Sequence, residues 1–387
     1  MSATSAYRDT WAEVDLSIIR DNVKSIKSRL PASTDFIAVV KADGYGHGGA
    51  QIAASAIHAG ADGLAVAYLS EALQLRRQGV TASILIMTPI RVQDVSLAIK
   101  HRLELTVASA EWLCEAMAYV PKSSKSKLRV HVKFDTGLGR IGIRDKSEWD
   151  ALVPCLQRKS IIVEGVYTHF ATAGRSDVRF LREQAAKFED IKAWIKEAGI
   201  SVRRYHCANS VAALRFPELA MDGVRIGAAL YGLVGDDYAK AYELKPALSL
   251  HSRLIHVKRI VKGQSVGYDV AYRAEEDEWI GTVPIGYADG WSQVLQGSEM
   301  LVGGSRAPIV GKIGMDQVMV RLSRQYPVGT LVTLIGSQGA EEVTCSELAA
   351  YLKSVPQELS VSLASRIGML YKDRDLYEKI EHSMARV

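Results

Sequence analysis

The sequence has few cysteines and lacks long apolar runs. Its four cysteines are scattered without a Cys-x-x-Cys pair, which argues against a disulfide framework and a zinc site, so we expect no metal. No apolar run approaches the roughly 18 residues that a membrane-spanning helix needs. The first eight residues contain no apolar segment of the kind found in signal peptides. These absences predict a cytoplasmic protein that has no membrane partner.

Strong charge of one sign is absent as well. The 387 residues carry a formal net charge of +5, and no segment dense in lysine or arginine is interleaved with aromatic residues. Such segments are typical of nucleic-acid-binding proteins, so nucleic acid is not an expected partner. The modest positive balance favours an anionic cofactor or a carboxylate substrate. The length predicts two domains, and 48% hydrophobic residues suffice for cores of ordinary size.

The first two thirds of the chain alternate short apolar runs with amphipathic stretches. The apolar runs, most of them β-branched, predict eight strands at residues 36–40, 64–68, 83–87, 104–107, 128–133, 163–169, 205–207 and 224–226. Helical patterns separate them, for example at residues 70–79, with Ser70 as N-cap and Gly79 as stop, and at residues 178–199. This alternation predicts a (β/α)8 barrel of the TIM type, because a doubly wound sheet more often has about five or six strands.

After about Pro246 the pattern becomes mainly strand-like. Strand patterns occupy residues 252–261, 279–283, 308–313, 317–322 and 330–335. Glycine-containing turns punctuate this region, and a helical pattern is confined to about residues 345–353. We therefore predict a barrel domain over residues 1–245 and a mainly-β C-terminal domain over residues 246–387.

Lys41 is an unusual residue for the end of a buried strand. The apolar run at 36–40 ends at Lys41, and a glycine-rich segment that contains Tyr45 follows at once. Desolvation at such a strand end lowers the pKa of the amine and makes it a nucleophile, so Lys41 is a candidate for a Schiff base. The alternative is a structural lysine whose ammonium group reaches solvent.

The other predicted barrel strands also end in polar residues. The active site of a β/α barrel lies at the carboxyl ends of its strands. At or just after these ends the sequence places Lys41, Tyr45, Lys133, Asp135, His169, His206, Asn209, Ser210, Arg225, Gly227 and Ala228. The backbone N–H groups of Gly227 and Ala228 beside Ser210 are typical of a phosphate site, although helix packing explains these small residues equally well. A phosphate site together with a Schiff-base lysine fits pyridoxal phosphate, with Arg225 facing the pyridine nitrogen.

Six segments of the chain resemble the motifs of the alanine racemase family. They lie at residues 38–48, 133–142, 165–170, 206–210, 284–290 and 310–317, and the resemblance extends from about Arg8 to about Tyr371. It implies a pyridoxal 5'-phosphate enzyme with a β/α barrel and a C-terminal β domain. It also implies an amino-acid racemase that interconverts L-alanine and D-alanine as a homodimer with shared active sites. Supply of D-alanine for the cell wall and breakdown of D-alanine both remain open as its role.

The resemblance assigns two bases on opposite faces of the substrate. Lys41 looks like the lysine that holds the cofactor as an internal aldimine and acts as the base on one face. Tyr268 looks like the second base, supplied by the partner subunit, because racemisation needs one group to remove the α-proton and another to return a proton from the other side. His169 looks like the imidazole beside that tyrosine, whose phenolate needs nearby cations for stabilisation.

The resemblance also assigns the residues that tune and bind the cofactor. Arg225 looks like the partner of the pyridine nitrogen, and it keeps that nitrogen unprotonated because an arginine does not give up its proton. Arg140 looks like the residue that contacts the phenolic oxygen of the cofactor and the substrate carboxylate. Lys133 looks like a lysine that is carbamylated in many members and holds Arg140. The remaining cofactor-binding residues implied are Tyr45, His169, Asn209, Ser210, Gly227 and Ala228, and the partner-chain residues near the substrate are Tyr287 and Met315.

Departures from the family pattern cluster near the expected entrance. Gly314 stands where many members have cysteine, and Lys312 stands where arginine is common. Gln357 occupies the place of a tyrosine that usually bonds the phosphate, and Arg366-Ile367-Gly368-Met369 replaces an Arg-Val-Pro-Arg tract. The bases are unaffected, so strict alanine specificity is the open point.

Three other functions are therefore weighed against an alanine racemase. The nearest is a racemase of broader specificity that acts on serine or basic amino acids. A decarboxylase of the same fold would usually have a Cys-Asp pair in its β domain, and the chain contains none. A non-catalytic pyridoxal-phosphate-binding protein would typically be a lone barrel, which the second domain contradicts.

Overall fold

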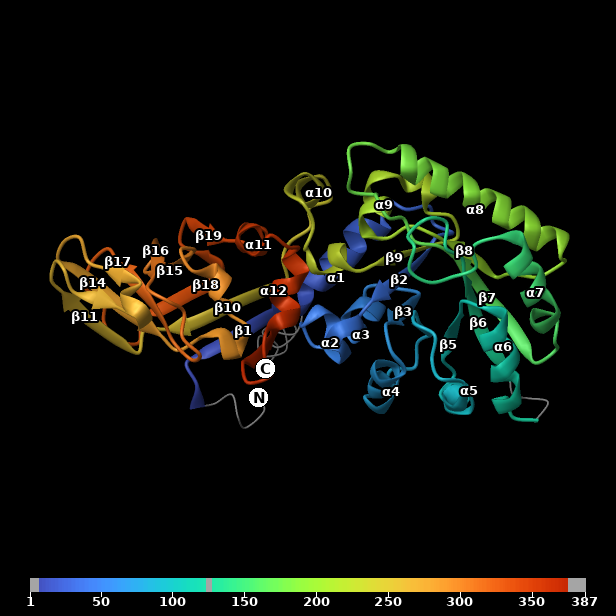
Figure 1. The fold of residues 1–387 in the computed structure, drawn as a ribbon, viewed down its shortest axis with the longest axis horizontal. Coiled ribbons are helices and arrows are strands. Elements are labelled where there is room, and N and C mark those ends of the chain that lie inside the picture. The colour runs from blue at the N-terminus through green and yellow to red at the C-terminus, as the bar shows by residue number, and fades with distance from the viewer. Residues whose placement is uncertain (1–6, 123–126, 375–387) are drawn as a thin grey trace, which may run out of the picture.

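The computed structural model of the protein describes residues 7–122 and 127–374. The outer ends of both predicted domain ranges, and most of the segment in which a signal peptide was sought, lie outside the described residues. Figure 1 shows an elongated molecule with a barrel at one end and a mainly-β domain at the other. Among the described residues, no helix combines the length and the apolar composition needed to cross a membrane.

The barrel consists of eight parallel strands. They are β2 (Asp35–Val39), β3 (Gly63–Val66), β4 (Ile84–Ile86), β5 (Glu104–Val107), β6 (Leu128–Lys133), β7 (Ile161–Tyr167), β8 (Arg204–His206) and β9 (Gly223–Ile226), in the order β8-β7-β6-β5-β4-β3-β2-β9. Backbone hydrogen bonds join the outer members β8 and β9. The N–H of Asp222 donates to the carbonyl of Tyr205 at 3.1 Å, and the N–H of Arg225 donates to that of Ala208 at 3.0 Å. The predicted (β/α)8 barrel and its eight strand positions are confirmed.

Helices surround this sheet in the order that the alternation predicts. They are α1 (Leu16–Lys27), α2 (Lys41–Tyr45), α3 (Gly49–His58), α4 (Leu69–Arg77), α5 (Val95–Lys100), α6 (Ala110–Ala116), α7 (Lys146–Leu156), α8 (Arg179–Glu197), α9 (Ser210–Arg215) and α10 (Asp236–Ala241). The prediction of Ser70 as an N-cap is wrong, because α4 is capped at Tyr68. The carboxylate of Glu71 accepts the N–H groups of Ala67 and Tyr68, so a glutamate fixes the start of this helix.

The interior of the barrel is divided into an apolar and a polar half. Successive residues of a strand point to opposite faces, so every second residue of each barrel strand points inward. The inward residues of β2, β3 and β4 form an apolar cluster of Ile37, Val39, Ala65 and Leu85. The strands β5 to β9 instead bury polar residues, which include Glu104, Thr106, His131, Lys133, His206 and Arg225. The polar half carries Lys133, His206 and Arg225, whereas Lys41 follows β2 of the apolar half.

The second domain is built on a long, largely antiparallel sheet. Its strands are β10 (Leu248–Arg253), β11 (His256–Ile260), β14 (Glu278–Val283), β15 (Glu299–Val302), β16 (Ser305–Val310), β17 (Val318–Leu322), β18 (Leu331–Gln338), β19 (Glu341–Val343) and β20 (Gly368–Lys372), together with β1 (Thr10–Asp15). The order is β11-β14-β17-β16-β15-β18-β10-β1-β20, with β19 paired to β18, and β12 (Ser265–Val266) pairs with β13 (Tyr272–Arg273) separately.

Several details of this domain differ from the sequence prediction, among them β15, β19 and β20, which no predicted strand covers. The strand predicted over residues 252–261 is two strands, β10 and β11, which pair with different neighbours. The helical pattern was expected only at about 345–353, where α11 (Cys345–Leu352) lies, but a second helix, α12 (Pro356–Ser362), follows it. Pro356 in the first turn of this helix is a local start signal, because proline is favoured at the first helical position.

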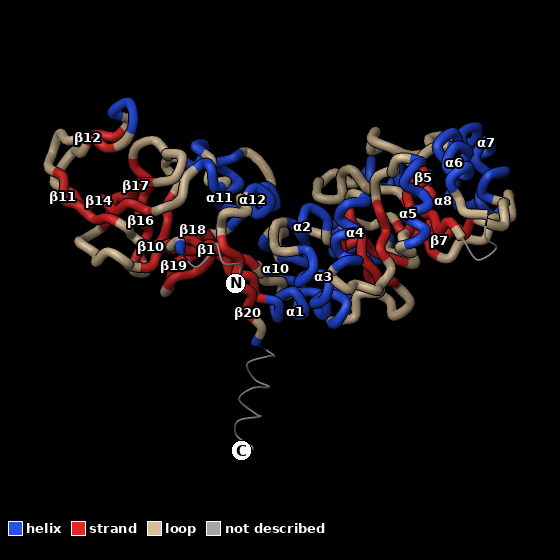
Figure 2. Tube along the Cα trace, turned by 90° about the horizontal axis from the view of Figure 1, so that it is seen from below, coloured by secondary structure: helices blue, strands red, loops and turns tan. Residues whose placement is uncertain are grey.

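The first strand of the chain belongs to the second sheet. β1 pairs antiparallel with β10 and parallel with β20, and Figure 2 shows the N-terminal strand within the β domain. The chain therefore starts in one domain, enters the barrel through α1 and returns at β10. Apart from this strand, the predicted domain boundary near residue 245 stays a prediction.

Candidate active site

A cavity of about 600 Å³ lies at the carboxyl ends of the barrel strands. A volume of this order suits a small-molecule site. Ten of the residues expected at the site line the cavity, namely Lys41, Tyr45, Lys133, Arg140, His169, Asn209, Ser210, Arg225, Gly227 and Ala228. The described lining includes no aspartate or glutamate, so its charged side chains are lysines and arginines. The cavity is suited to an anionic ligand.

Lys41 is presented by a turn with an unusual backbone. It lies just beyond the end of β2, after Val40, and the next residues take left-handed conformations, with φ of 52° at Ala42, 50° at Asp43 and 54° at Tyr45. Glu71 supports the turn by accepting the N–H of Ala42 at 2.6 Å. Burial, followed by the charge of Arg140, lowers the pKa of Lys41 below its ordinary value. A larger neutral fraction makes the amine a better nucleophile, as the sequence predicts.

The end of β9 and the start of α9 (Ser210–Arg215) together form a cradle for an anion. The hydroxyl oxygen of Ser210 accepts the N–H groups of Gly227 at 2.9 Å and of Ala229 at 3.3 Å. A Cβ atom at Gly227 would lie 2.5 Å from the Tyr45 hydroxyl oxygen, so only glycine lets that hydroxyl approach the backbone. Asn209 caps α9 by accepting the N–H of Ala212 at 3.1 Å. Because the Ser210 oxygen accepts both N–H groups, its own O–H stays free to donate to a phosphate beside the Tyr45 hydroxyl.

Arg225 is a buried cation that is held by neutral acceptors. It is 3% exposed. Its guanidinium donates to the carbonyls of Thr168 at 2.7 Å, His206 at 2.9 Å and Cys207 at 3.1 Å. The planar fork is thereby fixed in position without a carboxylate partner. Such a group can donate a hydrogen bond into the cavity but cannot supply a proton.

A chain of hydrogen bonds leads from Arg225 through the barrel to Glu104. Arg225 contacts Nδ1 of His206 at 2.8 Å, Nε2 of His206 contacts Nδ1 of His131 at 2.9 Å, and Nε2 of His131 contacts Glu104 at 2.8 Å. Arginine only donates and a carboxylate only accepts, so each histidine accepts at Nδ1 and donates from Nε2. The pKa of Glu104 is about 2, because bonds from His131 and the charge of Arg129 outweigh the burial that raises it. The positive charge of Arg225 is thus linked to an ionised carboxylate at the other end of the barrel.

His169 lies between Arg225 and Asn209. Its ring nitrogens are 3.3 Å from the Arg225 guanidinium and 3.3 Å from the Asn209 amide nitrogen. Burial and then the positive charge of Arg225 lower the pKa of His169 to about 2, so the imidazole is neutral near pH 7. A neutral imidazole accepts at one nitrogen only, so it accepts from one of these two donors at a time.

Lys133 is the most buried lysine of the site, at 2% exposure. Its amine donates to the carbonyl of Phe134 at 3.1 Å and lies 5.0 Å from the ring centre of Tyr167. Burial, and then the charge of Arg225, hold the pKa of Lys133 well below its ordinary value. The neighbouring loop that carries Arg140 is folded around Asp135, which accepts the N–H groups of Gly137, Gly139 and Arg140 at 2.9 to 3.0 Å.

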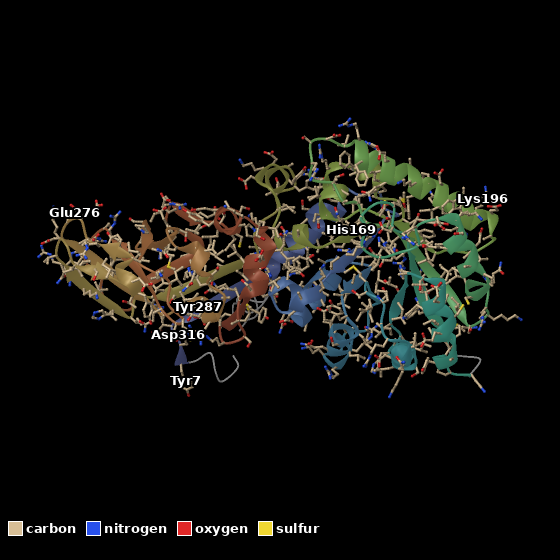
Figure 3. The ribbon with its side chains drawn as sticks, in the orientation of Figure 1. Tyr7, His169, Lys196, Glu276, Tyr287 and Asp316 are labelled. Carbon is tan, nitrogen blue, oxygen red and sulfur yellow. The ribbon has the colours of Figure 1, made fainter. Side chains whose placement is uncertain are left out.

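Three expected site residues lie outside this cavity, in the second domain. Tyr268, Tyr287 and Met315 are 72%, 43% and 54% exposed, and none of them lines the cavity. Figure 3 places Tyr287 in the β domain and His169 in the barrel, well apart. Tyr268 stands on a turn with positive φ at Gly267, Asp269 and Val270. The side chains are therefore directed at a surface and not at the cavity of their own chain.

Comparison with known proteins assigns the chain to a family. The family models described as alanine racemase N-terminal domain and alanine racemase C-terminal domain match residues 14–234 and 247–371. The chain belongs to the alanine racemase family. An alanine racemase of Geobacillus kaustophilus is 44% identical to it over 384 residues, covering 98% of this chain and 99% of the relative.

Solved racemase structures agree with the fold. The crystal structure of an alanine racemase from E. faecalis has a TM-score of 0.92 at 43% identity and covers 95% of this chain and 99% of its own. A histidine racemase from Leuconostoc mesenteroides has a TM-score of 0.85 at 30% identity, with 95% and 99% covered. Racemases whose names give different amino acids thus share this architecture.

The departures from the alanine racemase pattern lie away from Lys41. Gln357 donates to the carbonyl of Leu233 at 3.0 Å and does not line the cavity. Lys312 forms an ion pair with Asp269, next to Tyr268, at 2.5 Å. The carbonyl of Gly314 accepts the N–H of Tyr287 at 3.1 Å. In this racemase the departures therefore concern the β-domain residues near Tyr268 and Tyr287, and the segment after α11.

Sequence reasoning missed several residues of the site. Tyr167 lines the cavity, and Glu104 and His131 form the chain to Arg225. A signal was present, because Arg129, His131 and Lys133 are polar at every second position of a barrel strand. Gly165 is the complementary signal on β7, since a Cβ there would lie 2.3 Å from Nδ1 of His131.

Proposed function

We propose that this protein interconverts L-alanine and D-alanine with pyridoxal 5'-phosphate as cofactor and works as a homodimer with shared active sites. The observation that carries the proposal is the convergence of ten expected residues on one cavity, with an amine of lowered pKa at Lys41. Membership of the alanine racemase family and the names of its relatives support alanine as substrate. All four cysteines are free, which supports a reducing cytoplasm, where D-alanine would serve the cell wall.

The residues of the cavity fit this cofactor. Ser210, Tyr45 and the backbone at Gly227 and Ala228, with Asn209 beside them, would hold the phosphate, and Lys41 would bind the cofactor covalently. When bound, pyridoxal phosphate supplies an electron sink that acidifies the α-proton of an amino acid. Arg225 would donate a hydrogen bond to the pyridine nitrogen. Because Arg225 keeps its own proton, it limits the strength of that sink and so the side reactions of the substrate.

Two bases are needed to invert the α-carbon. The Lys41 amine removes or returns the proton on one face, and the phenol of Tyr268 does so on the other. Tyr268 is exposed on the second domain and is not part of its own cavity, so it would act in a second copy of the chain. His169, whose imidazole is 3.3 Å from the Arg225 guanidinium, would contact that phenol.

Arg140 and Lys133 would orient the substrate carboxylate. We expect the buried amine of Lys133, whose pKa is lowered well below its ordinary value by burial and by the charge of Arg225, to react in its neutral form with carbon dioxide and release one proton, which gives a carbamate anion. That anion would neutralise part of the positive charge around it and hold the Arg140 guanidinium for the carboxylate. The low pKa of the amine supports this modification, because only the neutral amine reacts.

The direct test is to mix the purified holoenzyme with L-alanine in deuterated water. We expect D-alanine to appear with deuterium at its α-carbon, measured by NMR and chiral chromatography. L-Alanine that stays fully protonated without formation of D-alanine would contradict the proposal. Omission of pyridoxal phosphate from a cofactor-stripped sample is the control, because activity must then depend on adding it back.

A racemase of broader specificity is the second candidate. The histidine racemase that shares the fold, and the changed residues Gln357 and Gly314, favour it. Turnover of L-alanine, L-serine, L-lysine and L-histidine should be compared as kcat/KM. We expect alanine to be preferred, and a large preference for a bigger side chain would replace alanine as the proposed substrate.

A further inference from the structure

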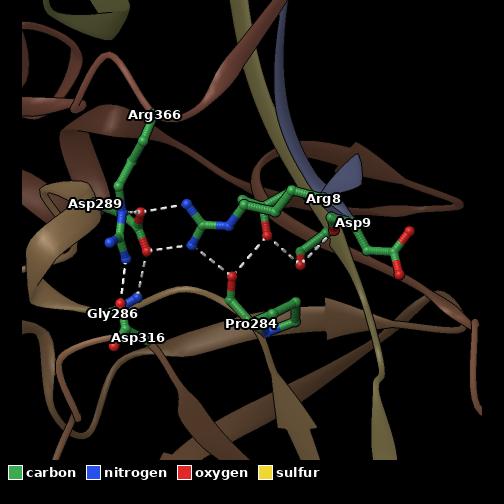
Figure 4. Close-up of polar contacts among 9 residues, drawn as sticks. Arg8, Asp9, Pro284, Gly286, Asp289, Asp316 and Arg366 are labelled. Carbon is green, nitrogen blue, oxygen red and sulfur yellow. Dashed lines mark hydrogen bonds and ion pairs between the residues drawn. The ribbon is translucent and has the colours of Figure 1, made fainter. Parts of the chain in front are cut away.

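A buried carboxylate with two arginine partners lies beneath the exposed residues Tyr287 and Met315. Asp289 has no exposed surface, and its two oxygens accept from the two terminal nitrogens of Arg8, each at 2.6 Å. Arg366 contacts the same carboxylate through Nε at 2.5 Å and also binds Asp316. Figure 4 shows this cluster of Arg8, Asp289, Arg366 and Asp316. Two arginines and two aspartates balance each other, so the cluster carries no net charge.

The cluster is built to remain ionised. Burial raises the pKa of Asp289, but hydrogen bonds from Arg8 and Arg366 lower it below the ordinary value. The N–H of Gly286 donates a further bond to this carboxylate at 2.9 Å. A buried carboxylate satisfied in this way fixes the groups around it, because each bond is lost if a partner moves.

Asp289 and Tyr287 belong to the same short turn. The turn is a 3-10 helix of Tyr287–Asp289, and its backbone is bonded to the loop that carries Met315. The backbone N–H of Tyr287 donates to the carbonyl of Gly314 at 3.1 Å, and the N–H of Ala288 donates to that of Met315 at 3.0 Å. A Cβ atom at Gly286 would lie 2.3 Å from the carbonyl oxygen of Met315, so glycine is required for this approach. Tyr287 and Met315 are therefore parts of one backbone unit.

Segments from both ends of the chain close on this unit. Arg8, just before β1, also donates to the carbonyl of Pro284 at 2.9 Å. Ala364, after α12, donates to the carbonyl of Asp289 at 3.0 Å. The carboxylate of Asp289 thus joins the N-terminal segment, the Tyr287 turn and the segment that carries Arg366.

We propose that Asp289, held by Arg8 and Arg366, is a positioning residue that fixes Tyr287 and Met315 in the orientation in which they contact the amino-acid substrate of a neighbouring subunit. The proposal rests on the proposed function, in which these two residues reach the substrate. Their side chains are about half exposed, so packing around them does not set their direction. The backbone and the ion cluster beneath them must do so.

The test is a double-mutant cycle of Asp289→Asn and Tyr287→Ala in the full-length holoenzyme. Asp289→Asn should raise KM for L-alanine about tenfold with kcat within about threefold, because Tyr287 contacts substrate without acting as a base. In the Tyr287→Ala background, Asp289→Asn should raise KM by less than about a further twofold, because the residue through which Asp289 acts is gone. If Asp289→Asn raises KM by the same factor in the wild-type and Tyr287→Ala enzymes, its role is purely structural and the proposal is overturned.

A matched control comes from another ion cluster of the same domain. Arg306 contacts Glu347 at 2.7 Å, Glu341 at 2.9 Å and Glu299 at 3.2 Å, and none of these residues bonds to the Tyr287 turn. Glu347→Gln should lower the melting temperature slightly and leave KM unchanged. A rise in KM equal to that of Asp289→Asn would mean that any damage to the domain has this effect, which also overturns the proposal.

A second pair of variants covers the case in which Asp289→Asn does not fold. Arg366→Lys keeps the positive charge beside Asp289, whereas Arg366→Gln removes it, so KM should be closer to wild type in the lysine variant. Equal rises in KM would overturn the proposal. Wild-type protein without racemase activity, or Tyr287→Ala with wild-type KM, would instead contradict the proposed function and with it the positioning role of Asp289. If Tyr287→Ala raises KM but the two substitutions have independent effects, only the positioning role of Asp289 is contradicted.

Discussion

The cavity in the barrel and the group of Tyr268, Tyr287 and Met315 in the β domain are ordered by different means. In the barrel, burial sets the chemistry, because desolvation lowers the pKa of Lys41 and Lys133. In the β domain, the three side chains are exposed, and turns, backbone bonds and ion pairs hold them. One chain can complete the first group by folding. The second group is displayed for something outside the chain.

The second group consists of large side chains that are exposed to solvent. Tyr268, Val270, Tyr287 and Met315 are all more than two fifths exposed in the single chain. Large hydrophobic side chains of the barrel, such as Phe180, are exposed too, so it is the proposed roles of Tyr268, Tyr287 and Met315 that point to a partner. A second copy whose barrel covers them is the partner that the proposed function requires.

Subunit complementation has the largest expected effect, and it tests whether the barrel cavity of one chain works with the exposed β-domain residues of another. Lys41→Ala and Tyr268→Phe should each be inactive as homodimers, because each site then lacks one base. After subunit exchange, the mixture should recover about a quarter of wild-type activity, because half of the dimers are mixed and half of their sites contain both bases. Alanine racemisation is the measurement.

The controls for this experiment separate the two regions. Tyr268→Phe alone should keep the cofactor covalently attached, and Lys41→Ala alone should lose that attachment, both seen in the absorbance spectrum. Mixing two different Tyr268 variants should restore nothing. If the first mixture also stays inactive although mixed dimers form, the two bases do not come from different chains.

Removing the charge of Glu104, at the end of the hydrogen-bond chain from Arg225, should have a smaller effect, which falls on the stability of the protein. The pKa of Glu104 is about 2 in the folded protein and ordinarily 4.5, so its contribution to stability is complete above pH 4.5 and is lost as the pH falls through about 2. Glu104→Gln should therefore lower the free energy of unfolding at pH 7 by about 3 kcal/mol. Denaturant titrations at several pH values measure this.

An exposed carboxylate of the barrel provides the control for that prediction. Glu189→Gln on α8 removes a residue that forms an exposed ion pair with Lys192, and it should change stability by less than about 0.5 kcal/mol. A wild-type stability curve that stays flat from pH 4.5 downward would contradict the role assigned to Glu104.

The smallest expected effect concerns the turn of Tyr268. Lys312 binds Asp269 at the surface, and exposed ion pairs contribute little. Lys312→Ala should lower kcat by about threefold, because Tyr268 is then held less firmly, and should leave cofactor absorbance unchanged. Lys258→Ala, on β11 of the same domain, is the control. A loss as large as that of Tyr268→Phe would mean that Lys312 has a direct part in the reaction.

Much of the barrel could be predicted because its signals are local. Most barrel strands are short β-branched runs, and Lys41, Lys133, His169 and Arg225 follow from reading what stands at or near the strand ends. The predicted start of α4 was wrong because the carboxylate of Glu71 accepts the N–H groups of Ala67 and Tyr68. A search for one capping serine does not reveal this contact. The missed residues Glu104 and His131 become meaningful only when their neighbours across the barrel are known.

The sequence by itself determined the alternation of strands and helices, the chemical groups at the strand ends, and the glycines at which the backbone must approach closely. Tertiary structure alone decided that β1 joins the second sheet, that Arg225 is linked to Glu104 through two histidines, and that Asp289 lies beneath Tyr287. The reason is physical. Local patterns follow from steric and hydrophobic preferences of neighbouring residues, whereas these contacts join residues that only packing brings together.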